Sequence, residues 1–316
     1  VVNTWLYSVS YGMSRFVAVG DSGTILTSDA GDSWTQSNSG TSALLRDVTY
    51  GVGLFVAVGN VSRIPSRTPV ILTSADGRAW AQVNPAPTTT PLSSVTYGNG
   101  TFVAVGGNYA GPETLVGVIL SSLDGKVWAV KSTLVREAPF QAAYLNNRFV
   151  ITGVANGSNQ YRTHPILLTS SDALQWELAR LPFEVNSSVS VVGYGNNTYV
   201  ATVRTIFSPA LYTSPDLKSW KYQGAGIAGI GAASDMAYGN NRFVAVASTS
   251  AIWTSPDGVN WTSPDGVNNF VFWTPSGLVT TRTLRRLTYG NGMIVAVGDK
   301  GTTLSSSDGI RWELHR

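Results

Sequence analysis

One pattern recurs seven times along this chain of 316 residues. Each copy has an apolar residue, a small residue and Tyr, then a turn, two apolar runs and a short acidic segment that ends in Trp. Such a repeat is one supersecondary unit, which buries its apolar faces only by stacking on its neighbours. The copies centre on Tyr11, Tyr50, Tyr97, Tyr144, Tyr194, Tyr238 and Tyr289 and close on Trp34, Trp80, Trp128, Trp176, Trp220, Trp261 and Trp312.

Each copy predicts four short antiparallel strands, A to D. Residues before the Tyr alternate between large and small, which is the period of a strand. Asn-Gly pairs such as Asn99-Gly100 supply the positive φ of a tight A–B turn. The β-branched run Phe102–Val105 predicts a strand B buried on both faces. We expect strand D to begin at the closing Trp and to form a polar outer edge.

These features predict an all-β fold. Sheets with two apolar faces must stack, and seven of this size close into a ring, so we expect a seven-bladed β-propeller of four-stranded antiparallel blades. We expect a single domain over 1–316 and contiguous blades, although Val1 to Thr4 are left open as a strand for the last blade. The predicted blades are 1–39, 40–86, 87–134, 135–182, 183–224, 225–275 and 276–316.

The amino-acid composition argues against several classes of function. The net charge is +3 with the basic residues scattered, so we expect no nucleic-acid interface. The absence of Cys excludes disulfides, thiolate metal sites and Cys nucleophiles. No apolar run is long enough to insert into a membrane. The two His residues, His164 and His315, form no metal-binding pair, and we expect neither a metal nor a cofactor.

The C–D hairpins carry a family resemblance. The segment Thr27–Trp34 fits Ser/Thr-x-Asp-x-Gly-x-Ser/Thr-Trp, and Ser74–Trp80, Ser122–Trp128 and Ser306–Trp312 are variants of it. Over its whole length the chain resembles Asp-box (BNR, neuraminidase-like) propellers. Its seven copies look more like secreted bacterial and photosystem-assembly-factor-type propellers than six-bladed sialidases.

The resemblance implies that these boxes are structural. In that family the carboxylate accepts backbone N–H bonds across the hairpin and the Trp packs between blades. Seven similar boxes cannot all be active sites. The predicted structural residues are the seven closing Trp residues together with Asp29, Asp76, Asp124, Asp172, Asp216, Asp257 and Asp308.

An eight-residue duplication marks the sixth copy. The segment 254–261 is followed at once by a near-copy, 262–269, which leaves two possible hairpin registers. We expect the first register, because Trp261 is kept there and Asn269 replaces it in the copy. A Ca²⁺ site using Asp257 and Asp265 is conceivable but weak.

Two motifs resemble catalytic or cofactor sites and are better explained as turns or linkers. Gly20–Gly23 matches a serine-protease tetrapeptide, but its counterpart is the turn Gly298–Gly301 and no His lies in its blade. Gly224–Gly229 is a literal GxGxxG without the helix that a dinucleotide site needs. We therefore predict no catalytic residue.

A sialidase-like glycoside hydrolase is the less favoured enzymatic alternative. Arg63-Ile64-Pro65 resembles the Arg-Ile-Pro element of sialidases, but it follows a box instead of preceding one. Such an enzyme also needs a placed pair of carboxylates. The Glu residues, none in a recognisable catalytic context, are Glu113, Glu137, Glu177, Glu184 and Glu313.

Long B–C segments in four consecutive copies predict a binding surface. They run over 60–69, 107–117, 155–165 and 204–210, and aromatic D–A linkers add to them. Arg and aromatic residues are typical of binding hot spots, although the same loops would also pack on each other and cover strand ends. The predicted partner-binding residues are Arg63, Arg67, Tyr109, Tyr161, Arg162, His164, Arg204 and Phe207.

We therefore expect a non-catalytic binding or scaffold propeller that engages a protein partner or an assembly. A lectin-like module is an alternative, against which the non-repeating loops count. The resemblance implies an extracellular, cell-surface or periplasmic location. The chain begins at Val1, which either a removed signal peptide or a trimmed chain explains.

Overall fold

A computed structural model describes residues 3–63, 66–84, 86–109, 115–156, 163–179, 181–182, 186–205, 209–225, 233–247, 251–262 and 282–315. The chain is an all-β propeller with seven antiparallel sheets, each contiguous in sequence, as predicted. Six sheets have four strands, and the sixth has three within the described residues. Helix in this part of the chain is limited to two 3-10 turns, η1 (Asp21–Gly23) and η3 (Asp299–Gly301).

The first four sheets follow the order of the chain. They comprise β1 (Leu6–Gly12), β2 (Arg15–Gly20), β3 (Ile25–Ser28) and β4 (Thr35–Ser37); β5 (Leu44–Gly51), β6 (Leu54–Arg63), β7 (Ser66–Ser74) and β8 (Ala81–Gln82); β9 (Ser94–Gly98), β10 (Thr101–Tyr109), β11 (Leu115–Ser122) and β12 (Ala129–Val135); and β13 (Glu137–Leu145), β14 (Arg148–Asn156), β15 (Thr163–Ser170) and β16 (Glu177–Leu178).

The last three sheets continue the same meander. They comprise β17 (Ser188–Gly195), β18 (Thr198–Arg204), β19 (Ala210–Ser214) and β20 (Lys221–Ala225); β21 (Ala233–Gly239), β22 (Arg242–Ala247) and β23 (Ile252–Ser255); and β24 (Leu284–Gly290), β25 (Met293–Gly298), β26 (Thr303–Ser306) and β27 (Glu313–His315).

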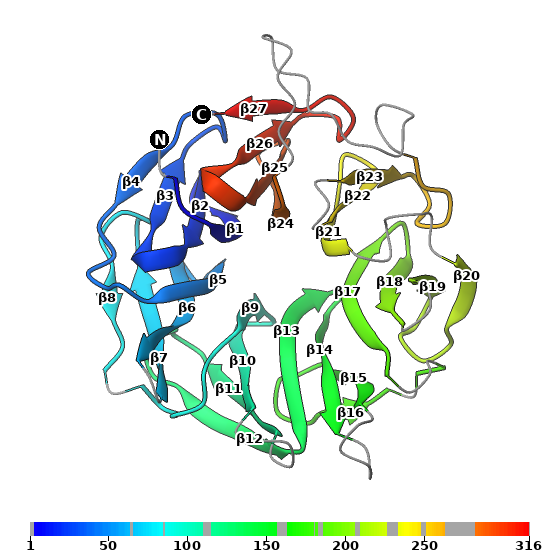
Figure 1. Cartoon of the computed structure of the whole chain (residues 1–316), viewed down its shortest axis with the longest axis horizontal. Helices are drawn as coiled ribbons and strands as arrows, with labels where there is room; N and C mark the ends of the chain where they lie inside the picture. The colour runs from blue at the N-terminus through cyan, green and yellow to red at the C-terminus, as the bar shows by residue number, and fades with distance from the viewer. Residues whose placement is uncertain are drawn as a thin grey trace. The chain divides into compact units, whose positions relative to one another are not determined.

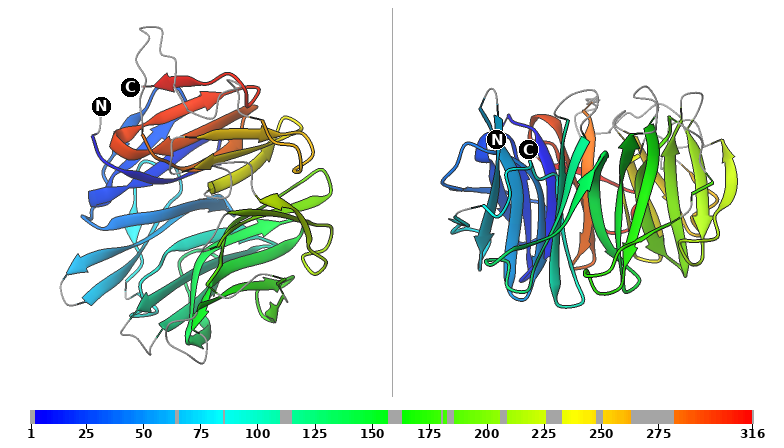
Figure 2. Two further views of the ribbon diagram at one scale, coloured as in Figure 1. Left: turned by 45° about the vertical axis from the view of Figure 1, so that its right-hand side comes forward. Right: turned by 90° about the horizontal axis from the view of Figure 1, so that it is seen from below.

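The chain forms two compact units. Unit 1 comprises Val1–Ala18, Thr27–Thr35 and Ser190–Arg316, and unit 2 comprises Val19–Leu26 and Gln36–Val189. Within unit 1 the inner strand β24 packs between β21 and β1 (Figure 1). Within unit 2, β9 packs between β5 and β13, and Figure 2 shows these sheets face to face. The first and last sheets are therefore neighbours inside unit 1.

The A–B turns have the backbone conformation that the Asn-rich sequence predicts. Asn99 and Gly100 have φ of 43° and 74°, and the turns at Asn146-Asn147 and Asn240-Asn241 are also left-handed at both positions. Two such positive values match the right-handed twist of the strands that the turn joins. Strand B follows, and in β10 the run Phe102–Gly106 is buried throughout.

The Tyr-Gly pair at the end of strand A interlocks neighbouring sheets. In unit 2 a Cβ on Gly51 would overlap the ring of Tyr97, and one on Gly98 would overlap the ring of Tyr144. In unit 1 the same relation joins Gly290 to Tyr11. Glycine is therefore required because the next blade's Tyr lies flat against the backbone. The same Tyr also contacts the second residue of its own strand B, as in Tyr97 and Phe102 at 4.7 Å between ring centroids.

Two buried carboxylates also join neighbouring inner strands. Asp47 Oδ2 accepts the N–H of Val95, at 3.0 Å, and the hydroxyl of Ser94. In unit 1, Asp235 Oδ2 accepts the N–H of Leu287 at 2.9 Å. Asp47 and Asp235 both lie three residues before the repeated Tyr, so the same position of the repeat forms this bond between inner strands in two places.

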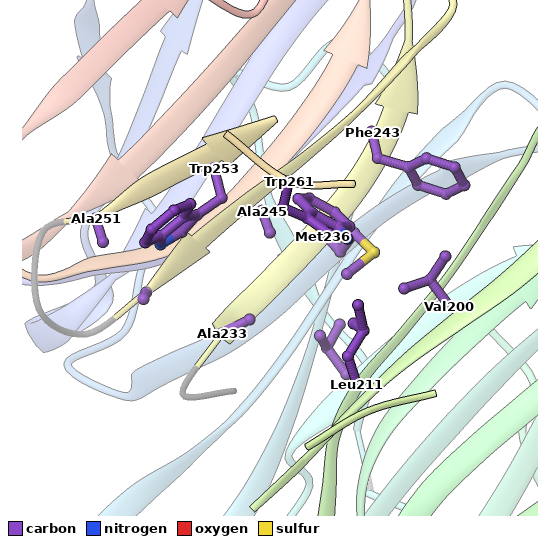
Figure 3. Packing of buried hydrophobic residues seen from close by; sticks show 11 residues of the cluster. Val200, Leu211, Ala233, Met236, Phe243, Ala245, Ala251, Trp253 and Trp261 are labelled. Atoms are coloured by element: carbon purple, nitrogen blue, oxygen red, sulfur yellow. The ribbon is translucent and has the colours of Figure 1, made fainter. Parts of the chain in front are cut away.

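Figure 3 shows one core that two sheets share. Val200 and Leu211 of the fifth sheet meet Met236 and Phe243 of the sixth, and Trp261 closes the cluster. Apolar side chains from both sheets are removed from water only when the sheets stack. This is the arrangement that two apolar faces per repeat predict.

Two local predictions are wrong. Strand D begins one residue after the closing Trp, for example at Ala81 after Trp80. The B–C segments expected as long loops are mostly longer strands. The β6–β7 ladder continues to Arg63 opposite Ser66, and β10–β11 continues to Tyr109 opposite Leu115.

In the described residues no helix is long and apolar enough to cross a membrane.

Candidate functional site

Six of the C–D hairpins share one pattern of carboxylate hydrogen bonds. In the second sheet Asp76 Oδ1 accepts the N–H groups of Arg78 and Ala79, at 2.8 and 2.9 Å. The hydroxyl of Ser74 accepts the N–H of Gly77, and Trp80 Nε1 donates to the Gly77 carbonyl at 2.9 Å. The carboxylate thus accepts hydrogen bonds from two backbone N–H groups that have no partner in a strand ladder. Asp124, Asp172, Asp216, Asp257 and Asp308 accept the same pair of N–H groups.

These bonds lower the pKa of the clamping carboxyls. The N–H groups of Ser219 and Lys218 lower the pKa of Asp216 to about 2. The pKa values of Asp76, Asp124 and Asp172 are lowered for the same reason. Hydrogen bonds to the charged form favour ionisation. These groups are therefore ionised and bound to their own hairpins at neutral pH, which suits a turn clamp and not a proton donor.

The first hairpin differs from the prediction. Its Ser28 hydroxyl accepts the N–H of Gly31, at 2.8 Å, which aligns Ala30 with the clamping Asp of the other hairpins. The carboxylate of Asp29 lies one position earlier and forms an exposed ion pair with Arg15 at 2.8 Å. The first box resembles the others in sequence, so the one-residue shift of its Asp becomes visible only in the structure.

The sixth hairpin uses the first of its two registers. Asp257 accepts the N–H groups of Val259 and Asn260, and Trp261 Nε1 donates to the Gly258 carbonyl at 3.0 Å. A bridge between Thr254 and Thr262 closes this hairpin. Asp265, the other half of the weak Ca²⁺ prediction, lies outside the described residues. In the described part no three His, Cys, Asp or Glu residues cluster as metal ligands do.

Of the eight predicted binding residues, three have described side chains. Arg67 in β7, His164 in β15 and Arg204 in β18 are exposed. Arg63 and Tyr109 end strands β6 and β10, where only the backbone is described. Within the described part of the chain, no side-chain hydrogen bond or ion pair links Arg67, His164 and Arg204 to one another. The remaining three, outside the described residues, are Tyr161, Arg162 and Phe207.

A repeated β-bulge marks a different position. In four sheets the A–B register skips the residue four places before the repeated Tyr. A bulge leaves one residue outside the ladder and re-aims its side chain, often beside functional sites. The bulged residues are Arg46, Phe140, Ser234 and Arg285.

At one of these bulges an arginine lies against two aromatic rings. The guanidinium carbon of Arg285 is 5.2 Å from the Trp5 ring centroid and 4.9 Å from that of Tyr7. Arg285 Nε donates to Asp299 Oδ1 at 2.6 Å, and Trp5 and Tyr7 meet edge to face at 6.4 Å. Thr4 is held by its carbonyl, which accepts the N–H of Gly301. We call Trp5, Tyr7, Arg285 and Asp299 the arginine–aromatic cluster.

The arginine–aromatic cluster is held in place yet open to solvent. Trp5 is 46% exposed, and the Arg285 side chain keeps 29% of its surface accessible. An exposed cation–π contact contributes about 0.5–1 kcal/mol. A surface ion pair contributes about 0–1 kcal/mol. The cluster therefore adds little to stability but presents a fixed cation and a large exposed indole.

Sequence reasoning missed this cluster, although the repeat contained a signal for it. The position four before the Tyr varies widely in an otherwise uniform repeat, whereas the position two before it is always apolar. Variation at one fixed site of a repeat marks a side chain that packing does not determine. Around the seven copies that position holds Tyr7, Arg46, Ser93, Phe140, Ser190, Ser234 and Arg285.

Three other groups raised by the sequence have simple structural settings. Ser22 is exposed at the tip of η1 with φ 54° and ψ 35°, which matches Lys300 in η3 at 55° and 37°. His315 ends β27; its Nε2 lies 2.7 Å from the Ser305 hydroxyl, and burial lowers its pKa. Burial raises the pKa of Glu137, at the start of β13.

Comparison with solved structures bears on the fold. A structure described as YCF48 bound to D1 peptide aligns with 96% of this chain and 93% of its own, at TM-score 0.68 and 16% identity. YCF48 from Cyanidioschyzon merolae aligns at TM-score 0.63 and 15% identity, covering 96% and 95%. The likeness is one of fold. A streptogramin B lyase aligns at TM-score 0.64 and 10% identity, over 100% and 95%. No protein-family model and no curated protein sequence matches this chain.

Proposed function

We propose that this chain is a non-catalytic binding protein that holds a segment of a protein partner at the arginine–aromatic cluster. The observation that carries the proposal is the Arg285 guanidinium fixed over Trp5 and Tyr7 at a bulge position whose residue differs between copies of the repeat. Trp, Tyr and Arg are the residues most enriched in binding hot spots. Anchors that are ordered before binding also reduce the entropy cost of association.

Two further observations support a protein ligand. The propeller resembles YCF48, whose structure was determined with a D1 peptide bound. The six clamping carboxylates lie within their own hairpins, each bonded to local N–H groups, which leaves them unsuited to acid–base chemistry. Binding through Arg67, His164 and Arg204 stays a prediction, as does an extracellular, surface or periplasmic location, which cell fractionation would test.

A peptide-display selection against the whole chain tests the proposal. Peptides recovered on the native chain should bind Trp5→Ala and Arg285→Ala at least tenfold more weakly, since hot-spot truncations cost about 2 kcal/mol or more. Arg15→Ala is the matched control, because Arg15 also pairs with an acid, Asp29, but is not part of the arginine–aromatic cluster. Unchanged affinity in both cluster variants would retire the proposal. Binding found only on a glycan array would favour the lectin-like alternative.

A further inference from the structure

The outer strand of the third sheet is unusually long. β12 has seven residues, whereas the other outer strands within the described residues have two to five: β4, β8, β16, β20 and β27. β12 pairs with β11 on one side and is the edge of its sheet within the described residues. An open strand edge presents backbone N–H and C=O groups that can pair with another chain.

The ladder shows which groups of β12 point outward. The N–H of Arg136 donates to the Leu115 carbonyl, at 2.7 Å, so Arg136 bonds inward toward β11. Inward and outward residues alternate in an antiparallel strand, so Thr133 and Val135 direct their backbone groups to the open side. A bulge leaves Lys131 out of the ladder, and pairing with β11 is regular over Ser132–Val135. The usable edge is therefore this last part of the strand.

Side chains hold the strand in place while leaving its edge accessible. Leu134 packs against the core that contains Phe149 and Leu168 of the fourth sheet. Val135 points away and is 74% exposed, although it is β-branched and apolar. A rigid edge with one exposed aliphatic side chain is the geometry that strand addition uses, because main-chain bonds give affinity and side chains give specificity.

Charge selects between two kinds of occupant. Lys131 lies in this strand, Lys126 and Arg136 lie before and after it, and all three are exposed; no acidic residue lies between 126 and 136. A second copy of the chain would bring the same cations to the edge, where like charges repel. An acidic segment would meet opposite charges instead. The edge therefore favours a partner with acidic residues over self-pairing.

We propose that β12 is a docking edge for an extended, acidic segment of a partner protein. The segment adds to the third sheet as a further strand, pairs with Thr133 and Val135, covers the Val135 side chain with an aliphatic residue and places its acids near Lys131 and Arg136. The arginine–aromatic cluster takes no part, so this proposal stands apart from the proposed function.

Fluorescence anisotropy with a defined probe tests this edge. The probe is a capped, labelled peptide, Glu-Val-Glu-Val-Thr-Val-Glu, and its control carries N-methyl groups on alternate residues so that one edge cannot pair. We expect the control peptide to bind about tenfold more weakly or worse, a difference of roughly 1.4 kcal/mol. Thr133→Pro, which removes an outward N–H, should weaken probe binding equally, whereas Thr133→Ala should retain it.

If Thr133→Pro does not fold, a variant that reverses charge at this edge still tests the proposal. Lys131→Glu combined with Arg136→Glu should weaken the probe and reduce the dependence of its affinity on salt. Trp5→Ala should bind the probe normally, which separates this edge from the cluster. The proposal is overturned if the probe does not bind, if N-methylation has no effect, or if sedimentation shows the chain dimerising through β12.

Discussion

At the scale of single residues, the aspartates of the C–D hairpins act as acceptors for otherwise unpaired N–H groups. Their folded pKa lies below the ordinary value, to about 2 for Asp216, through the N–H groups of Ser219 and Lys218. A carboxyl with a lowered folded pKa stabilises the fold above its unfolded pKa of about 4, and this contribution is lost as the pH falls toward the folded value. Acid should therefore loosen these hairpins between about pH 4 and pH 2.

Calorimetry across that range tests the clamp. Asp216→Asn should lower Tm at pH 7 by about 2–4 °C, which corresponds to roughly 1 kcal/mol in a chain of this kind. The fall of Tm between pH 5 and pH 2 should also become shallower than in the native chain. Asp29→Asn is the control, because the Asp29 side chain is 69% exposed and pairs only with Arg15 among its described contacts. Equal responses of the two variants would contradict the assignment.

At the scale of elements, the inner strands interlock through the Tyr-Gly pair. The Tyr is predictable as a landmark from its repetition, and the Gly after it reads in the sequence as part of a turn. Only the structure shows that Gly98 has no room for a side chain because the Tyr144 ring lies against it. Leu145 replaces this Gly in the fourth copy, a departure for which nothing in the described contacts gives a reason.

Substitution at Gly98 measures this interlock. Gly98→Ala should destabilise the chain by about 1–3 kcal/mol, the usual cost of overpacking. In Gly98→Ala combined with Tyr144→Ala, part of that cost should disappear, because the overlapping ring is gone. Urea unfolding of the two single variants and the double variant gives the coupling free energy. Strictly additive effects would show that the ring does not set the requirement for Gly.

Elements also show what sequence reasoning could and could not find. Strand order, A–B turns and buried strand B follow from period two, Asn-Gly pairs and β-branched runs, each of which is local. The sequence predicts loops where the hairpins β6–β7 and β10–β11 extend, because their Arg, Ser and Gly residues lack a strand pattern. Strand pairing continues through these residues because the strands that lead into them are already paired in register.

At the scale of the whole molecule, the repeat separates constant from variable positions. The apolar, Tyr, Gly and hairpin positions build contacts between sheets inside each unit, so they recur from copy to copy. The bulge position four before the Tyr varies from copy to copy. The fold was therefore predictable from the positions that repeat. The arginine–aromatic cluster was not, because it depends on a position that varies between copies. It also depends on Trp5, which lies outside the repeat and packs against β24.

Hydrogen–deuterium exchange with a display-selected peptide distinguishes the constant positions of the repeat from the variable ones. On binding, exchange should slow in the segments around Trp5–Tyr7 and Arg285, with no change in the C–D hairpins that hold Asp76 or Asp124. Peptide-dependent protection of those hairpins, with the cluster unaffected, would contradict this expectation.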